Sequence, residues 1–206
     1  MEQRIAAVLV TSDVGRAAPP GVDPAAFARA VAEDTYEIVA ALDLVTPVLV
    51  TTVPDMDEIV WPGTPVVRLA ERDAADGGEA LVRAAFDGVA RAVPGAGEAV
   101  LVSGDAPDLP GLLIGKLFRA LGRSAVAVCP ADGGGAVAIA ARLPYPEWAR
   151  AGLDTPGILT DLRAAAPQRR AVAAGPGWHR LRGPGDLSLL DPGLEGWENT
   201  RALLGG

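Results

Sequence analysis

The stretch Ala99-Val-Leu-Val-Ser-Gly-Asp-Ala-Pro-Asp-Leu109 decides the fold of this chain. Its first half is a continuous apolar run, which is typical of a strand buried on both faces of a sheet. Its second half changes to glycine, aspartate and proline, which indicates that the strand ends in a loop. The residues that follow predict a helix over 110–121, because leucines recur there at helical spacing: Leu113, Leu117 and Leu121.

The same alternation extends over the first two thirds of the chain. Apolar runs predict strands at residues 5–10, 46–52, 66–69, 99–103 and 124–129. Amphipathic segments predict helices over 79–93, over 110–121, and after Asp23-Pro24, where an N-cap precedes a first-turn proline. Because strands separated by helices pair in parallel, we expect an α/β fold, a three-layer α/β/α sandwich around a mostly parallel, Rossmann-like sheet.

The last third departs from this alternation. Residues 135–141 form another apolar run, but only a few glycine-rich residues separate it from the strand before, too few for a parallel crossover. We therefore expect an edge strand, an antiparallel strand or a hairpin partner there. Thr155-Pro156 is typical of an N-cap and first helical turn, and residues 197–204 predict a terminal helix.

Composition bounds the function. The 206 residues carry 18 basic and 26 acidic side chains, a net charge of −8, and half of them are hydrophobic. This length fits one domain over residues 1–206, and the acidic balance argues against nucleic acid or anionic membrane surfaces as partners. The single cysteine, Cys129, excludes a disulfide within the chain and a cysteine-cluster metal site. No apolar run approaches a membrane span, so we expect a cytoplasmic protein.

Three loops carry the candidate chemistry. They follow predicted strands at residues 11–16, 103–109 and 130–135, and ligands of open parallel sheets bind beyond the carboxyl ends of strands. Asp105 and Asp108 lie three residues apart across a proline turn, an arrangement that suits Mg²⁺ or another hard divalent cation.

Each loop also has a structural interpretation. Asp108 could cap the following helix, and Asp132 with its glycines is equally typical of a hairpin turn. Asp13 and Arg16 could merely end a strand and stay solvated. With the single histidine His179 and no glycine-flanked nucleophile or phosphate-loop motif, serine or cysteine hydrolases and ordinary dinucleotide binding are poorly supported.

The order and spacing of these loops resemble a known family. It comprises small bacterial proteins of the glycosyltransferase-A fold, related to the 2-phospho-lactate guanylyltransferases. Residues 100–109 resemble its strand followed by Gly-Thr-Asp-Cys-Pro-Asp-Leu. Further similar segments occur in the family's order, and with residues 100–109 they span most of the chain: Asp34-Thr35, Gly77–Leu81, Asp132–Gly134 and Thr155-Pro156 with Leu159.

The resemblance implies a nucleotide-diphospho-sugar-transferase-like sandwich that transfers a nucleotidyl or glycosyl group with Mg²⁺ or Mn²⁺. It implies a nucleotide or nucleotide sugar as ligand and an unidentified small-molecule acceptor. Asp105 would be catalytic and hold the metal ion with Asp108, and Asp132 would be catalytic on the acceptor side. The residues implied for nucleotide binding are Thr11, Ser12, Asp13, Gly15, Arg16, Gly78, Gly133 and Gly134.

The chain also departs from the family pattern. Arg16-Ala-Ala-Pro-Pro20 stands where the family has a basic Lys-Thr-Arg-Leu stretch, and Ala131 replaces the glutamate of Glu-Asp-Gly-Gly. The family's late Asp-x-Asp-Thr-Pro-x-Asp-Leu has its nearest fragment in Asp191-Pro192. Two alternatives to a transferase therefore stay open: a noncatalytic binding or scaffold module, and a hydrolase that uses the same carboxylates to activate water.

Overall fold

The computed structural model describes residues 3–70, 78–194 and 196–205. Gly77, part of one segment that resembles the family, lies outside the described residues. Within them the chain forms a seven-stranded sheet in the order β3-β2-β1-β4-β6-β5-β7. The strands are β1 Gln3–Val10, β2 Val45–Thr51, β3 Val66–Arg68, β4 Ala96–Ser103, β5 Val126–Pro130, β6 Ala136–Arg142 and β7 Val172–Ala174.

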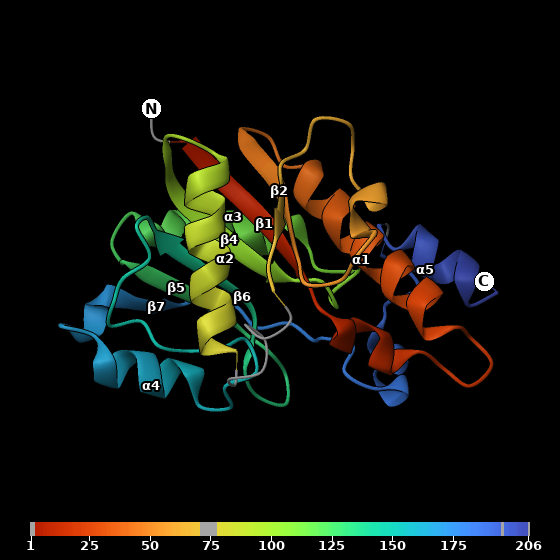
Figure 1. Ribbon diagram of the computed structural model, residues 1–206. Coiled ribbons are helices and arrows are strands. Elements are labelled where there is room, and N and C mark those ends of the chain that lie inside the picture. Colours follow the sequence, from red (N-terminus) through yellow and green to blue (C-terminus); the bar gives the residue numbers. More distant parts are fainter. Residues whose placement is uncertain (1–2, 71–77, 195, 206) are drawn as a thin grey trace.

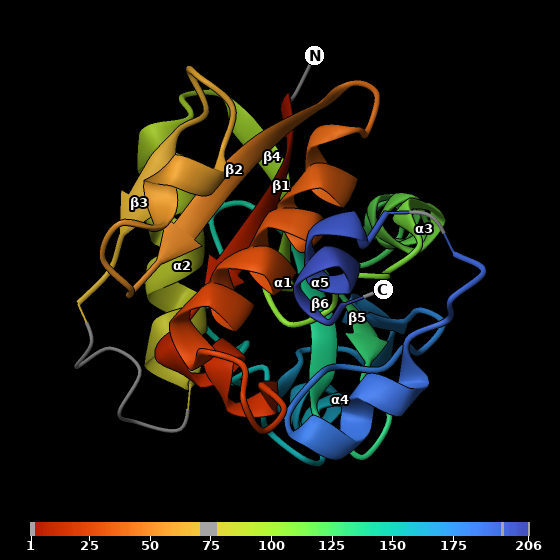
Figure 2. The ribbon, with the colours of Figure 1, turned by 90° about the vertical axis from the view of Figure 1, so that its right-hand side faces the viewer.

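Helices cover both faces of this sheet (Figures 1 and 2). The α-helices are α1 Pro24–Ala40, α2 Glu79–Ala92, α3 Gly111–Leu121, α4 Ile158–Ala165 and α5 Glu198–Leu203. Short 3-10 turns lie between them: η1 Ser12–Ala17, η2 Met56–Ile59, η4 Arg169–Ala171 and η5 Pro184–Leu189. The three-layer α/β architecture is the one expected from the sequence.

The alternation of side chains along β1 divides the core into two apolar layers. Ala6, Val8 and Val10 pack in the cluster that holds α1, α3 and Trp197. The intervening Ile5, Ala7 and Leu9 pack in the cluster that holds α2 and α4. Because side chains of a strand point alternately to opposite faces, a strand covered on both sides must be apolar throughout, as its continuous run predicted.

The antiparallel strand lies inside the sheet and not at its edge. β6 pairs antiparallel with both β4 and β5, whereas β1 pairs parallel with β2 and β4. The expected antiparallel hairpin partner is therefore confirmed, and the edge position is wrong. The physical reason is burial: residues 136–141 are all 0% exposed, which an edge strand with one free side does not reach.

The helix starts were predicted with mixed success. Asp23 caps α1 as expected, since its Oδ2 accepts a hydrogen bond from the amide of Ala26 at 2.9 Å. The predicted cap at Thr155 is wrong: α4 begins at Ile158, and the Thr155 hydroxyl accepts from the amide of Gly152. Asp108 does not cap α3 either, because the N-cap position is Pro110. The terminal helix is confirmed as α5.

The segment after β7 returns across the carboxyl ends of the strands. Residue 178 bridges to residue 131 beside β5, and the amide of Leu181 donates to the carbonyl of Asp105 at 2.8 Å. The chain then passes through η5 and places α5 against α1 (Figure 2). Among the described residues, no helix combines the length and the apolar character needed to span a membrane.

Candidate functional site

A cleft of about 740 Å³ opens at the carboxyl ends of β1 and β4. Four further segments surround it: η1, the start of α2, residues 153–156 and the segment around residue 180. Its lining residues are Leu9, Thr11, Ser12, Asp13, Arg16, Gly78, Leu81, Val82, Ser103, Leu153, Asp154, Thr155, Pro156 and Arg180. This is the edge at which an open parallel sheet binds its ligand.

A second, wider hollow of about 1100 Å³ lies on the other side of η1. Thr11, Ser12 and Arg16 line both spaces, so η1 forms the wall between them. Its lining includes four prolines (Pro19, Pro20, Pro24 and Pro54). The cleft is the more polar of the two neighbouring spaces.

Asp105 reaches the cleft through an arginine. Its two carboxylate oxygens accept from Nε and Nη2 of Arg180 at 2.7 and 2.9 Å, a bidentate pair. Both side chains are buried, at 7% and 8% exposure, and Arg180 itself lines the cleft. A guanidinium matched to both oxygens of a carboxylate is the strongest common form of protein ion pair.

Arg180 is fixed from other sides as well. Its Nη1 donates to Oδ1 of Asp154 at 2.7 Å and to the carbonyl of Ala136 at 3.2 Å. Burial by itself lowers the pKa of Arg180, but Asp105 and then Asp154 outweigh burial, so the pKa of Arg180 lies above its ordinary value. Arg180 is therefore a permanent cation in the cleft wall.

A second arginine, Arg182, approaches the carboxylate of Asp154. Nη2 of Arg182 lies 3.7 Å from Oδ1 of Asp154 and donates to the carbonyl of Gly134 at 2.8 Å. Asp154 is 68% exposed, whereas the two arginines are 8% and 35% exposed. Two guanidinium groups therefore meet at one solvent-facing carboxylate.

Asp108 lies in a different environment from Asp105. Its Oδ1 accepts from the indole nitrogen of Trp178 at 3.1 Å and lies 2.9 Å from Nε2 of His179. The Asp108 side chain is 0% exposed, and its other oxygen is buried without a hydrogen-bond partner. Asp108 therefore fixes the chain at Trp178 by a buried hydrogen bond. It is not among the residues that line the cleft. His179 is thus held next to a buried carboxylate, and its Nε2 has no hydrogen-bond partner among the described residues.

Asp132, Gly133 and Gly134 form the hairpin turn between β5 and β6. Gly133 and Gly134 both have positive φ angles, 81° and 103°, which glycine adopts at little steric cost. Asp132 is exposed, and its amide donates to the carbonyl of Trp178 at 2.9 Å. None of the three lines the cleft, although the carbonyl of Gly134 holds Arg182.

The first loop and the start of α2 do meet at the cleft. Asp13 and Arg16 form an exposed ion pair with 2.8 Å between Oδ1 and Nη2, so they stay solvated as well as lining the cleft. Gly15 lines the second hollow, and a Cβ there would lie 2.8 Å from the carbonyl oxygen of Pro24. Gly78 lines the cleft at the N-cap of α2 with φ of 81°.

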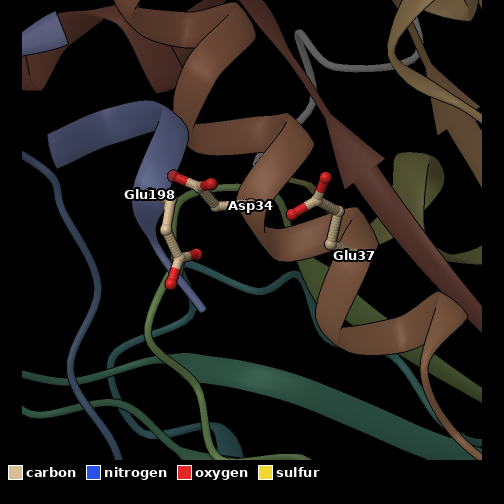
Figure 3. A group of neighbouring side chains, drawn as sticks. All are labelled: Asp34, Glu37 and Glu198. Carbon is tan, nitrogen blue, oxygen red and sulfur yellow. The ribbon is translucent and has the colours of Figure 1, made fainter. Parts of the chain in front are cut away.

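A third group of acidic side chains lies away from the cleft. Asp34 and Glu37 of α1 and Glu198 of α5 bring carboxylate oxygens within 4.8 Å of one another (Figure 3). Both oxygens of Asp34 accept hydrogen bonds from α5, Oδ1 from the amide of Asn199 at 3.0 Å and Oδ2 from that of Thr200 at 2.8 Å. Asp34 therefore caps the amino end of α5 from a neighbouring helix.

The pKa shifts of this group follow from burial. Burial raises the pKa of Asp34, and the hydrogen bonds from residues 199 and 200 lower it by less. The pKa of Glu37 is raised by burial and then by repulsion from neighbouring carboxylates, chiefly Asp34. The backbone amide of Gly196 lowers the pKa of Glu198. Burial thus raises the pKa of both α1 carboxylates, repulsion adds to the shift of Glu37 alone, and a backbone hydrogen bond lowers the pKa of Glu198.

The expected metal ligands do not fit a divalent ion. A metal ion on Asp105 would sit beside the guanidinium that already occupies both of its oxygens, and Asp108 has no exposed oxygen to offer. Hard divalent cations take carboxylate oxygens, carbonyls and water, and Arg180 places a positive charge at that position. The guanidinium of Arg180 thus takes the position beside Asp105 that a metal ion would need.

Arg180, Arg182 and Asp154 are the site residues that the sequence analysis missed. One signal could have found the arginines. The family pattern Asp-x-Asp-Thr-Pro-x-Asp-Leu fits residues 180–187, Arg-Leu-Arg-Gly-Pro-Gly-Asp-Leu, better than Asp191-Pro192, with arginines in place of its first two aspartates. Asp186 supports this match, because its Oδ2 accepts from the amides of residues 182 and 183 and fixes the turn into η5.

Comparison with known proteins gives structural matches but no sequence-family match. No protein-family model matches the sequence, and no curated protein matches it. A proposed nucleotide-diphospho-sugar transferase from Desulfovibrio desulfuricans is similar with a TM-score of 0.63 and 19% identity, over 99% of this chain and 97% of that one.

Two further structures are similar at 14% identity and a TM-score of 0.58. One is 4-diphosphocytidyl-2C-methyl-D-erythritol synthase from Anaerococcus prevotii, matched over 98% of this chain and 96% of that one. The other is glucosyl-3-phosphoglycerate synthase from Mycobacterium tuberculosis in complex with Mn²⁺, UDP and glucosyl-3-phosphoglycerate, over 98% and 78%. The chain therefore has the nucleotide-diphospho-sugar transferase-like α/β fold.

Proposed function

We propose that the cleft binds the phosphate-bearing part of a nucleotide or nucleotide sugar, and that the protein is a divergent nucleotidyl- or glycosyltransferase. The observation that carries this proposal is the position of the cleft, at the carboxyl ends of β1 and β4 with η1 and the start of α2 around it. Fold alone does not define an activity, so the proposal rests on this site.

The lining residues support a phosphate ligand. Thr11 and Ser12 offer hydroxyl and amide donors, Gly78 lines the cleft at the N-cap of α2, and Arg16 adds an exposed cation. The similar structures include a nucleotidyl-group synthase and a UDP-bound glucosyl synthase. Of the residues expected to bind nucleotide, we propose this role for Thr11, Ser12, Asp13, Arg16 and Gly78.

Calorimetric titration tests the proposal. GTP, CTP, UTP, ATP and their nucleotide sugars are titrated into the protein in EDTA, in Mg²⁺ and in Mn²⁺. We expect at least one of them to bind, and Arg16→Gln to weaken that binding by roughly threefold to tenfold, the effect of one exposed charge-assisted hydrogen bond.

Arg91→Gln is the matched control. It removes the same charge from an exposed position near the end of α2, whereas Gly78 at the beginning of that helix lines the cleft. The two ends of α2 are about 20 Å apart at 1.5 Å per residue. Absence of binding by every nucleotide and nucleotide sugar under all three conditions would remove the proposal.

The ion pair of Asp105 favours a second candidate function, a noncatalytic binding module of the same fold. A carboxylate with both oxygens held by Arg180 is not placed to act as a base or nucleophile. Product assays on any nucleotide that binds separate the candidates. Turnover with release of pyrophosphate or of a nucleoside diphosphate supports the transferase, and stable binding without turnover across a panel of acceptors supports the module.

The relationship to the 2-phospho-lactate guanylyltransferases belongs to this proposal and rests on the sequence motifs. It is tested by including GTP with a phosphorylated 2-hydroxy acid in the acceptor panel. We give no role in binding to the expected Mg²⁺ or Mn²⁺ at Asp105 and Asp108, because these carboxylates do not fit the ion.

A further inference from the structure

The strongest feature outside the expected site residues is the meeting of Arg180 and Arg182 at Asp154. Nη1 of Arg180 lies 2.7 Å and Nη2 of Arg182 lies 3.7 Å from the same oxygen, Oδ1 of Asp154. Arg180 donates a hydrogen bond to this oxygen and Arg182 lies within ion-pair distance of it, and paired guanidinium groups of this kind commonly hold phosphate or carboxylate groups.

The cationic half of this arrangement is built into the fold. Asp105 and the carbonyl of Ala136 hold Arg180, which is 8% exposed, and the carbonyl of Gly134 holds Arg182. Gly135 leaves room for this contact, because a Cβ there would lie 3.0 Å from Nη2 of Arg182 and would also clash with the carbonyl oxygen of Leu153.

Asp154, the anionic member of this group, is the one that a ligand can replace. Asp154 is 68% exposed, lies in the loop before α4 and lines the cleft. Solvent reaches the carboxylate of Asp154 and screens its pairing with the buried Arg180, and its contact with Arg182 is a long one of 3.7 Å, so a more highly charged ligand group can displace it. A phosphate offers more acceptor oxygens and more negative charge than the carboxylate that it would replace.

We infer that Arg180 and Arg182 form an anion subsite for a phosphate group of the ligand, that Asp154 fills this subsite until ligand binds, and that binding there needs no divalent ion. The inference rests on the proposed function, since Arg180 and Asp154 line that cleft and Arg182 adjoins it through its 3.7 Å contact with Asp154. With Asp154 in place, two guanidinium groups face two carboxylates, and the local charge is balanced. When Asp154 moves away, one net positive charge faces the cleft.

Arg180 also explains why Asp105 does not fit the metal ion that the sequence analysis expected there. A divalent ion and a guanidinium both neutralise phosphate charge, and Arg180 occupies both oxygens that the ion would need. The acidic side chain retained at Asp105 then serves as a positioning residue for Arg180.

The experiment is calorimetric titration of inorganic pyrophosphate and of UDP, GDP and CDP at constant ionic strength in EDTA. It compares the unmodified protein with the Asp154→Asn and Arg182→Gln variants. We expect Asp154→Asn to bind pyrophosphate roughly threefold to tenfold more tightly, and Arg182→Gln to bind it more weakly by a similar factor. Addition of Mn²⁺ is expected to change the affinity for UDP by less than about twofold.

Asp87→Asn is the control, because it removes the same charge from an exposed position of α2 and should leave the affinity unchanged. Equal pyrophosphate affinity of Asp154→Asn and the unmodified protein would overturn the subsite. Nucleotide binding that requires Mn²⁺ would overturn it too, while leaving the proposed function intact. Pyrophosphate binding with the expected variant effects, but no nucleotide binding, would support the subsite and remove the proposed function.

Discussion

Asp34 and Asp105 are two buried aspartates that each tie an early part of the chain to its last third, and they do so with different donors. Asp34 accepts from the backbone amides of Asn199 and Thr200 and from the Asn199 side chain at 2.9 Å. Asp105 accepts from a guanidinium, that of Arg180. Their exposures are 0% and 5%, so burial alone does not distinguish them.

The difference in donors separates a structural role from a candidate functional one. Neutral amides at the start of α5 pair with both oxygens of Asp34, so this carboxylate has a structural role as a helix cap. Arg180 carries a full charge into the wall of a cleft, where it also contacts the exposed Asp154. A buried carboxylate beside a charged partner in a cleft is the better guide to a site.

The largest expected effect comes from breaking the charged pair. Arg180→Met should destabilise the protein by about 3–5 kcal/mol, because it leaves Asp105 buried without its counter-charge. The free energy of unfolding is measured by urea denaturation. The double variant with Asp105→Leu should recover much of the loss, since an apolar pair replaces a buried ion pair at little cost. A single variant as stable as the unmodified protein would contradict the pairing.

Removing the side chain of Asp34 should lower the free energy of unfolding by less, and its effect should be confined to α5. Asp34→Ala removes three hydrogen bonds to α5, and we expect a loss of about 2–3 kcal/mol, within the range for hydrogen bonds to a charged group and for helix caps. Hydrogen exchange should accelerate first at the amides of residues 199–203. Asp34→Asn, whose amide oxygen still accepts, should lose about half as much. Unchanged exchange in α5 would show that Asp34 does not cap it.

An exposed cap sharpens the comparison. Asp23 caps α1 from within its own helix and is exposed, so Asp23→Ala should lose about 1 kcal/mol, measured by the same denaturation. The difference between the Asp34 and Asp23 variants then reports the burial of the interhelical cap. Equal losses would indicate that burial adds nothing.

The smallest effect concerns the repulsion around Asp34. The pKa of Glu37 is raised in the folded protein, so folding binds protons and stability falls as pH rises above its ordinary value of 4.5. Glu37→Gln should therefore gain roughly 0.5 kcal/mol at pH 7 and nothing below about pH 4. Thermal unfolding from pH 4 to 8 measures this difference. A loss at neutral pH, or stabilisation of the unmodified protein by Mn²⁺ that Glu37→Gln abolishes, would instead indicate a metal ion bound by the three carboxylates.

The sequence predicted those parts of the fold that depend on local pattern. The apolar runs marked the strands, and Asp23-Pro24 marked the start of α1, because burial and capping act over a few neighbouring residues. The same reasoning pointed to residues 11–16, four of which line the cleft, since strand ends follow from strand positions, whereas Gly78 was indicated by the family resemblance.

The sequence could not predict the partners of the candidate carboxylates. Arg180 is 75 residues from Asp105 in the chain, and Asp34 is 165 residues from Asn199. No periodicity links residues at such distances, and although a motif could have pointed to Arg180 and Arg182, it does not name their partners.

By itself, then, the sequence determined an α/β sandwich with acidic loops at one edge of its sheet, because hydrophobic periodicity and turn residues act locally along the chain. Only the tertiary structure decided which cation faces Asp105, which helix Asp34 caps and where Asp154 lies. The pairings of Asp105 and Asp34 depend on how the described residues after β7 return across the strand ends, where η5 packs against η1 and α5 against α1.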